Sequence, residues 1–218
     1  MLAYRMYNLL TDYSFIVRPL KVDYKDSKKG KVDDGRFAFI IEDDSDVAKR
    51  NDLKKLEIPR VRSTRLHQET IAIFSLFQLL IGNLDWSALK GPDPEECCHN
   101  VKLIGPEPLK DSDPIIPVPY DFDSAGLVDA PYVGPPLGLG LNSVTQRLYR
   151  GYCTNNHALP EARARMLDNE TAIMDILRND EFLSKNSQKR ALKYLSKYFE
   201  MLRDDDDFNK QVVMKCRK

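Results

Sequence analysis

A single apolar segment constrains this chain more than any other feature of its sequence. Within residues 63–81, apolar side chains recur at helical spacing at Leu66, Ile71, Ile73, Phe74, Phe77, Leu80 and Ile81. This spacing is typical of a helix. Gly82 follows directly, and glycine tolerates the left-handed conformation in which many helices end. We therefore expect a central buried helix over residues 63–81, with the rest of the chain arranged around it.

Short strands are expected on both sides of this helix. Residues 15–24 alternate apolar and polar side chains, as a half-buried strand does. Residues 36–41 form a second apolar run, and the polar, glycine-containing stretch between the two predicts an antiparallel hairpin. Further short strands are expected at residues 101–104 and 115–123. Prolines interrupt the last of these, so it should lie at a sheet edge or bend.

The second half of the chain is expected to be mostly helical. The expected helices span residues 160–179, 186–203 and 207–215. Mixed strands and helices followed by helices alone predict an α+β fold. We divide it into residues 1–142, which form the core, and residues 143–218, which form a helical extension of the same domain.

Residues 1–10 have the pattern of a helix from the first residue, without the Ser, Thr, Asp or Asn that usually precedes one. We therefore expect the chain to begin inside a larger structure.

Charge and hydropathy exclude several partners. Lysine plus arginine and aspartate plus glutamate number 33 each, so no net field favours nucleic acid or an anionic membrane. The longest apolar run, residues 71–81, contains Ser75 and Gln78 and is too short to span a bilayer. No signal peptide is recognisable. The oligomeric state has no signature in the sequence.

The four cysteines, Cys97, Cys98, Cys153 and Cys216, show no CxxC spacing. We expect neither a disulfide framework nor a structural zinc site. Reduced thiols would suit a cytoplasmic protein.

Three polar stretches carry the residues most suited to chemistry. Asp85 follows the central helix, Asn100 precedes an expected strand, and Asp121 and Asp123 end another. Two carboxylates two residues apart point to the same face of an extended segment, where they repel unless a cation or proton lies between them. Mg²⁺ prefers such oxygen ligands. Asp85 is suited to accepting a proton from a hydroxyl group.

The same residues also suit structural roles. An aspartate after a helix is an ordinary turn or cap residue, and Asp121 with Asp123 fits a hydrogen-bonded turn. His99 fits a hydrogen-bonding role better than that of a ligand. Arg147, Tyr149 and Arg150 suit either an anionic substrate group or internal pairing.

The order of these motifs resembles the catalytic half of the protein-kinase superfamily, in which a loop Asp, a loop Asn and a later metal-binding Asp recur. It is most similar to the atypical bacterial branch of the CotH spore-coat kinases and, more distantly, to HipA-like kinases. The resemblance covers roughly residues 1–128. It implies a kinase-like C-terminal lobe that uses ATP and Mg²⁺.

The resemblance also implies roles for individual residues. Asp85 matches the catalytic Asp, and Asn100, Asp121 and Asp123 match the metal ligands. Residues 37–43 match the strand and acidic turn before the hinge where adenine binds, which makes Glu42 and Asp43 the nucleotide-binding candidates.

Two departures from the kinase pattern stand out. The loop between Asp85 and Asn100 is much longer than in ordinary kinases. The chain has no Gly-rich loop, and Lys21 lies at the wrong place in the order for the phosphate-binding lysine. Three interpretations follow: the chain is a truncated copy that lacks the N-terminal lobe, the lobe is supplied elsewhere, or the domain binds without catalysing.

The sequence leaves three functions open. The first is ATP- and Mg²⁺-dependent transfer of a phosphoryl group to a hydroxyl-bearing acceptor. The second is a catalytically inactive kinase-like module for binding or scaffolding. The third is a metal-dependent hydrolase built on the paired carboxylates.

Overall fold

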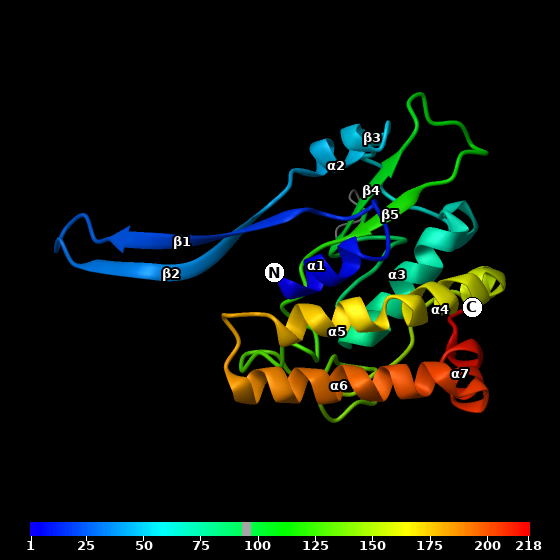
Figure 1. The fold of residues 1–218 in the computed structure, drawn as a ribbon. Helices are drawn as coiled ribbons and strands as arrows, with labels where there is room; N and C mark the ends of the chain where they lie inside the picture. Colours follow the sequence, from blue (N-terminus) through cyan, green and yellow to red (C-terminus); the bar gives the residue numbers. More distant parts are fainter. Residues whose placement is uncertain (93–96) are drawn as a thin grey trace.

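The computed structural model describes residues 1–92 and 97–218, and these form an α+β fold (Figure 1). Part of the long loop before Asn100 therefore lies outside the described residues. The helices are α1 (Leu2–Asn8), α2 (Asp44–Arg50), α3 (Gln68–Ile81), α4 (Leu159–Asp168), α5 (Glu170–Arg178), α6 (Lys185–Arg203) and α7 (Asp205–Gln211). The strands are β1 (Val17–Lys25), β2 (Val32–Ile41), β3 (Lys54–Lys55), β4 (Val101–Gly105) and β5 (Ile116–Pro119). The α+β prediction is confirmed.

Helix α3 is the predicted central helix. It begins at Gln68, later than expected, because Ser63–Arg65 form a separate 3-10 turn and the His67 side chain caps α3 by accepting the backbone N–H of Thr70. Every residue from Thr70 to Ile81 is buried. Gly82 ends the helix with φ 66°, the left-handed cap that its position predicted.

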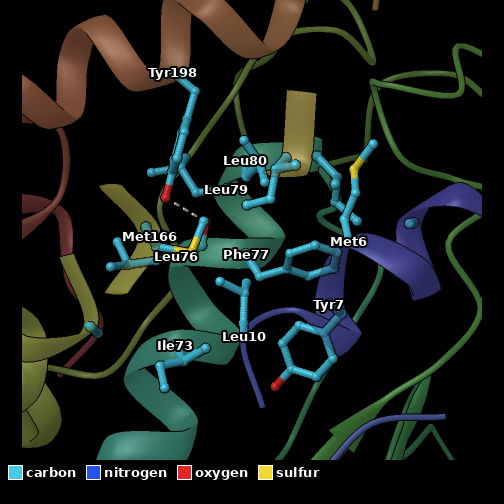
Figure 2. Packing of buried hydrophobic residues seen from close by; sticks show 14 of the residues in the cluster. Met6, Tyr7, Leu10, Ile73, Leu76, Phe77, Leu79, Leu80, Met166 and Tyr198 are labelled. Carbon is cyan, nitrogen blue, oxygen red and sulfur yellow. Dashed lines mark hydrogen bonds between the residues drawn. The ribbon is translucent and has the colours of Figure 1, made fainter. Parts of the chain in front are cut away.

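Both ends of the chain pack on α3 (Figure 2). Tyr7 of α1 places its ring 4.7 Å from that of Phe77. From the other side, the buried hydroxyl of Tyr198 on α6 donates to the carbonyl of Leu76 at 2.9 Å. One core thus joins the first helix, the central helix and the C-terminal helices.

A second, smaller core lies beneath β4, where Trp86 packs edge-on against Phe74 of α3 at 4.8 Å between ring centroids. This packing fixes the segment immediately after α3.

The hairpin of β1 and β2 projects away from the helical body (Figure 1). The strands pair antiparallel from Val17–Ile41 to Lys25–Val32, as predicted. Strand β2 starts earlier than expected, because the turn is confined to a few residues in which Asp26 accepts two backbone N–H groups. Large apolar side chains remain exposed on the arm at Tyr24, Val32, Phe37, Ile40 and Ile41.

The small sheet has the order β3-β4-β5, and β4 and β5 run antiparallel. The proline-containing β5 lies at the edge, as its sequence predicts. Val101 pairs with Pro119. The start of β4 and the end of β5 therefore meet, which brings Asn100 close to Asp121.

The expected helix over residues 160–179 is two helices, α4 and α5, separated at Asn169. Helix α6 follows its prediction closely, and α7 is shorter than expected. Among the described residues, no helix combines the length and the apolar character that crossing a bilayer requires.

The prediction that the cysteines form no disulfide framework was wrong. Cys153 and Cys216 form a disulfide with their Cα atoms 4.9 Å apart, and the adjacent Cys97 and Cys98 are also joined. The first pair has no spacing signature, because contacts between distant segments bring it together. The expectation of a cytoplasmic location therefore loses its argument from reduced thiols.

Candidate functional site

Asn100 and Asp121 flank the paired ends of β4 and β5. Both have left-handed backbones, with φ 53° and 54°, which Asn and Asp tolerate better than most residues. The N–H of Tyr120 donates to the carbonyl of Asn100 at 3.2 Å. The N–H of Asp121 donates to the Tyr4 hydroxyl of α1 at 2.9 Å. Helix α1 thus helps to fix the acidic turn.

Asp85 lies on the short loop after α3 and is held from several directions. Its N–H donates to Oδ1 of Asn83 at 3.0 Å. Nδ2 of Asn100 donates to the Asp85 carbonyl at 2.8 Å and to Oδ2 at 3.1 Å. Nε2 of His99 lies 2.7 Å from Oδ1. His99 and Asn100 therefore orient a carboxylate whose side chain remains 45% exposed.

Asp121 and Asp123 form a turn and not the extended segment that we expected. Strand β5 ends at Pro119, and the N–H of Asp123 points to Oδ1 of Asp121 at 3.4 Å. Asp123 accepts from the hydroxyls of Ser124 at 3.1 Å and Tyr132 at 3.2 Å. The two carboxylates are nevertheless close neighbours.

The acidic residues influence one another electrostatically. Partial burial, followed by the charges of Asp123 and Asp85, raises the pKa of Asp121 above its ordinary value. A bound cation would reverse this effect. Asp85, Asp121 and Asp123 therefore belong to one acidic neighbourhood, which also contains the amide of Asn100.

An open cavity of about 470 Å³ lies over this neighbourhood. Asp85 and Asp123 line it, together with Gly82, Leu84, Ser124, Tyr132, Val133, Gly134, Pro136 and Val144. Asn100 and Asp121 are not among these lining residues. The cavity opens where the loop after α3 meets the turn after β5. This position allows a small molecule to approach the Asp85 carboxylate.

A metal at this site would depend on oxygen ligands. In the part of the chain that the structure describes, no three His, Cys, Asp or Glu side chains lie close enough to hold an ion by themselves. The oxygens of Asp121, Asp123 and Asn100 are hard donors of the kind that Mg²⁺ takes, with phosphates and water completing its shell. The donor chemistry therefore fits Mg²⁺ better than zinc.

Glu42 and Asp43, the nucleotide candidates, use their carboxylates in local structure. Glu42 accepts the N–H of Ile16 at 2.9 Å and pairs with Arg50 Nε at 2.9 Å. Asp43 caps α2 by accepting the N–H of Ser45 at 2.9 Å. Neither residue lines the cavity at Asp85. The structure therefore does not bring these two residues to the cavity at Asp85.

Of the candidates for anion binding, Arg147 is structural. Its guanidinium donates to the carbonyls of Leu79, Leu80 and Tyr194 and lies 3.6 Å over the Tyr194 ring. Burial raises the pKa of Tyr149, which keeps its hydroxyl neutral.

Arg150 differs from Arg147 in its position, because it lies beside the loop that carries Asp85. Its Nη1 donates to the carbonyl of Leu84, the residue directly before Asp85, at 3.1 Å. Arg217 joins Arg150 at this place, because its Nε donates to the carbonyl of Arg150 at 2.6 Å. Arg217 was not identified as a candidate from the sequence. Contacts between distant segments place it there, and no local pattern signals them.

Comparisons of the chain with known protein families, with curated proteins and with solved structures found no match.

Proposed function

We propose that this chain is a kinase-like phosphotransferase that uses ATP and Mg²⁺ to phosphorylate a hydroxyl-bearing acceptor. The observation that carries the proposal is the gathering of Asp85, Asn100, Asp121 and Asp123 beside one open cavity. Phosphoryl transfer needs a base for the hydroxyl and oxygen donors for the metal. These four residues supply both.

Asp85 is the proposed base. Each carboxylate oxygen has two lone pairs, so the contacts to His99 and Asn100 leave it able to accept the proton of an acceptor hydroxyl in the cavity. The same contacts fix the direction in which the carboxylate points, which matters because a base must lie within hydrogen-bonding distance of the proton that it removes.

Asp121, Asp123 and Asn100 are the proposed holders of Mg²⁺. When bound, Mg²⁺ would neutralise charge on the phosphates of the nucleotide. The pKa of Asp121 is raised first by partial burial and then by the negative charges of Asp123 and Asp85, and a cation would compensate the latter. Tyr4 and Asn100 would keep the turn and the loop in place.

A binding module is the second candidate. The exposed apolar side chains of the β1–β2 arm favour it, since exposed apolar surface is often an interaction site. In that case the acidic site would bind a ligand without transferring its phosphate.

Calorimetric titration of the purified chain with ATP, with and without Mg²⁺, tests the proposal. We expect binding that requires Mg²⁺ and is lost in Asp121→Asn. Asp129→Asn is the matched control, because Asp129 is also an aspartate with positive φ but is not one of the proposed metal ligands. Unchanged ATP affinity in Asp121→Asn would refute the metal assignment.

Phosphoryl transfer itself separates the two candidates. A folded chain that binds MgATP should label an acceptor in the wild type and fail to do so in Asp85→Asn. Binding without transfer would support the module. Hydrolysis of a phosphoester in the absence of nucleotide would favour a hydrolase over both.

A further inference from the structure

Arg217, near the end of the chain, is fixed beside the loop that carries Asp85. Its N–H donates to the carbonyl of Gly151 at 2.8 Å, and its carbonyl accepts the N–H of Cys153 at 2.9 Å. The disulfide between Cys153 and Cys216 joins the same two segments. The backbone of Arg217 is therefore held on both sides.

The side chain of Arg217 is equally constrained. Its guanidinium lies 5.0 Å from the centroid of the Trp86 ring and 4.5 Å from that of Tyr152. Nε donates to the carbonyl of Arg150, and Arg150 in turn donates to the carbonyl of Leu84. Both guanidinium groups thus lie against residues 84–86, which carry Asp85 at their centre.

Among the residues that the structure describes, these two positive charges are poorly compensated. Within residues 1–92 and 97–218, neither arginine forms an ion pair. Nε of Arg150 and Nη2 of Arg217 are buried and have no acceptor among the described residues. Burial, followed by the charge of Arg217, lowers the pKa of Arg150, and the charge of Asp85 acts against this lowering. Two partly buried like charges cost free energy, which a bound anion would offset.

We propose that Arg150 and Arg217 form a subsite for a phosphate-type oxyanion carried by the acceptor. Arginine suits this role, because its planar donors match the oxygens of such a group. Asp85 lies next to Leu84, to whose carbonyl Arg150 donates, and its charge also contributes to the raised pKa of Asp121. An acceptor would therefore place its anionic group at the arginines and its hydroxyl at Asp85. The acceptor assignment rests on the proposed phosphotransfer, whereas anion binding does not.

Trp86 provides a direct readout, because it is the single tryptophan of the chain and lies against the Arg217 guanidinium. The experiment is a titration of the oxidised chain with inorganic phosphate, at ionic strength held constant with NaCl, followed by tryptophan emission. We expect a saturable change in the wild type. Binding should weaken by about tenfold or more in Arg217→Gln, which loses a charge-assisted hydrogen bond. Arg217→Lys, which keeps the charge but loses the planar donors, should fall between the two.

Arg178→Gln is the matched control, because Arg178 pairs with Asp175 on an exposed part of α5 and should leave phosphate binding unchanged. The absence of a saturable response in the folded wild type would overturn the subsite. Equal phosphate affinity in the wild type, Arg217→Gln and Arg217→Lys would also overturn it.

The source of the oxyanion is tested with MgATP. If the acceptor supplies it, Arg217→Gln should leave MgATP affinity unchanged while weakening phosphate binding. An equal loss of both affinities would assign the arginines to the nucleotide and refute the acceptor subsite. The phosphate titration needs neither nucleotide nor metal, so its result stands even if the chain fails to bind ATP.

Discussion

Removal of the Cys153–Cys216 disulfide should destabilise the protein strongly. The two cysteines are 63 residues apart, and the segment between them includes helices α4 to α7. Closing a loop of this length restricts the unfolded chain and stabilises the fold by about 4 kcal/mol in the chain-entropy description. For a chain of this size, 1 kcal/mol corresponds to roughly 2–4 °C in Tm. We therefore expect the Cys153→Ser/Cys216→Ser variant to melt about 10 °C lower than the oxidised wild type.

Thermal unfolding followed by circular dichroism, in oxidised and reduced samples, is the measurement. A variant with Cys97→Ser and Cys98→Ser serves as the control, because it retains only the bridge between distant segments. Reduction should lower the Tm of the wild type and of this control but leave the Cys153→Ser/Cys216→Ser variant unchanged. Equal Tm values for oxidised and fully reduced wild type would show that the bridge does not contribute to stability.

Four further predictions concern single side chains. Tyr198→Phe should lower the free energy of unfolding by about 1 kcal/mol, because a buried hydrogen bond is lost. Tyr7→Phe should leave the free energy of unfolding nearly unchanged, because the buried Tyr7 hydroxyl has no partner among the described residues. Urea denaturation compares the two variants, and an equal loss of stability in both would contradict this difference. Gly82→Ala should lower the free energy of unfolding by roughly 1–2 kcal/mol or more in the same assay, because the φ of Gly82 is 66° and the added Cβ would meet the Tyr194 hydroxyl. A denaturation midpoint equal to that of the wild type would show that the helix cap relaxes. Asp121→Asn should stabilise the fold at neutral pH. The raised pKa of Asp121 means that its ionisation favours the unfolded chain, and this destabilisation grows as pH rises through the raised pKa. The gain should vanish below about pH 3, where the carboxyl is protonated in both states; a loss of stability at neutral pH would contradict the sign.

Local patterns were sufficient to predict the central helix and its end. The spacing of apolar residues before Gly82 identified α3, because one element buries them all and the cap depends on a single residue. The hairpin and the edge position of β5 followed from alternation and from proline chemistry. The start of α3 was misplaced, because the cap at His67 is an unusual one that spacing does not show.

Much of the site could not be predicted, because pairing between distant segments assembles it. The motif order brought Asp85, Asn100 and Asp123 into consideration, but only the hydrogen bonds of Asn100 to Asp85 and the cavity that Asp85 and Asp123 share show that they meet. The turn at Asp121 replaced an expected strand, because pairing stops at Pro119. Arg217 was missed for the same reason as the disulfide, since Arg150, to whose carbonyl it donates, lies 67 residues earlier in the chain.

The packing of both α1 and the C-terminal helices against α3 has a consequence for synthesis. Tyr4 meets Asp121 across 117 residues, and Arg165 donates to the carbonyl of Leu10 across 155. A ribosome adds about 5–20 residues per second, so α1 leaves it roughly ten seconds or more before the helices that cover it. During that interval α1 can contact Phe77 of α3 but lacks its neighbour α5, so the nascent chain leaves apolar surface uncovered of the kind that chaperones bind. The core around α1 and α3 can therefore close only after α5 and α6 have been synthesised.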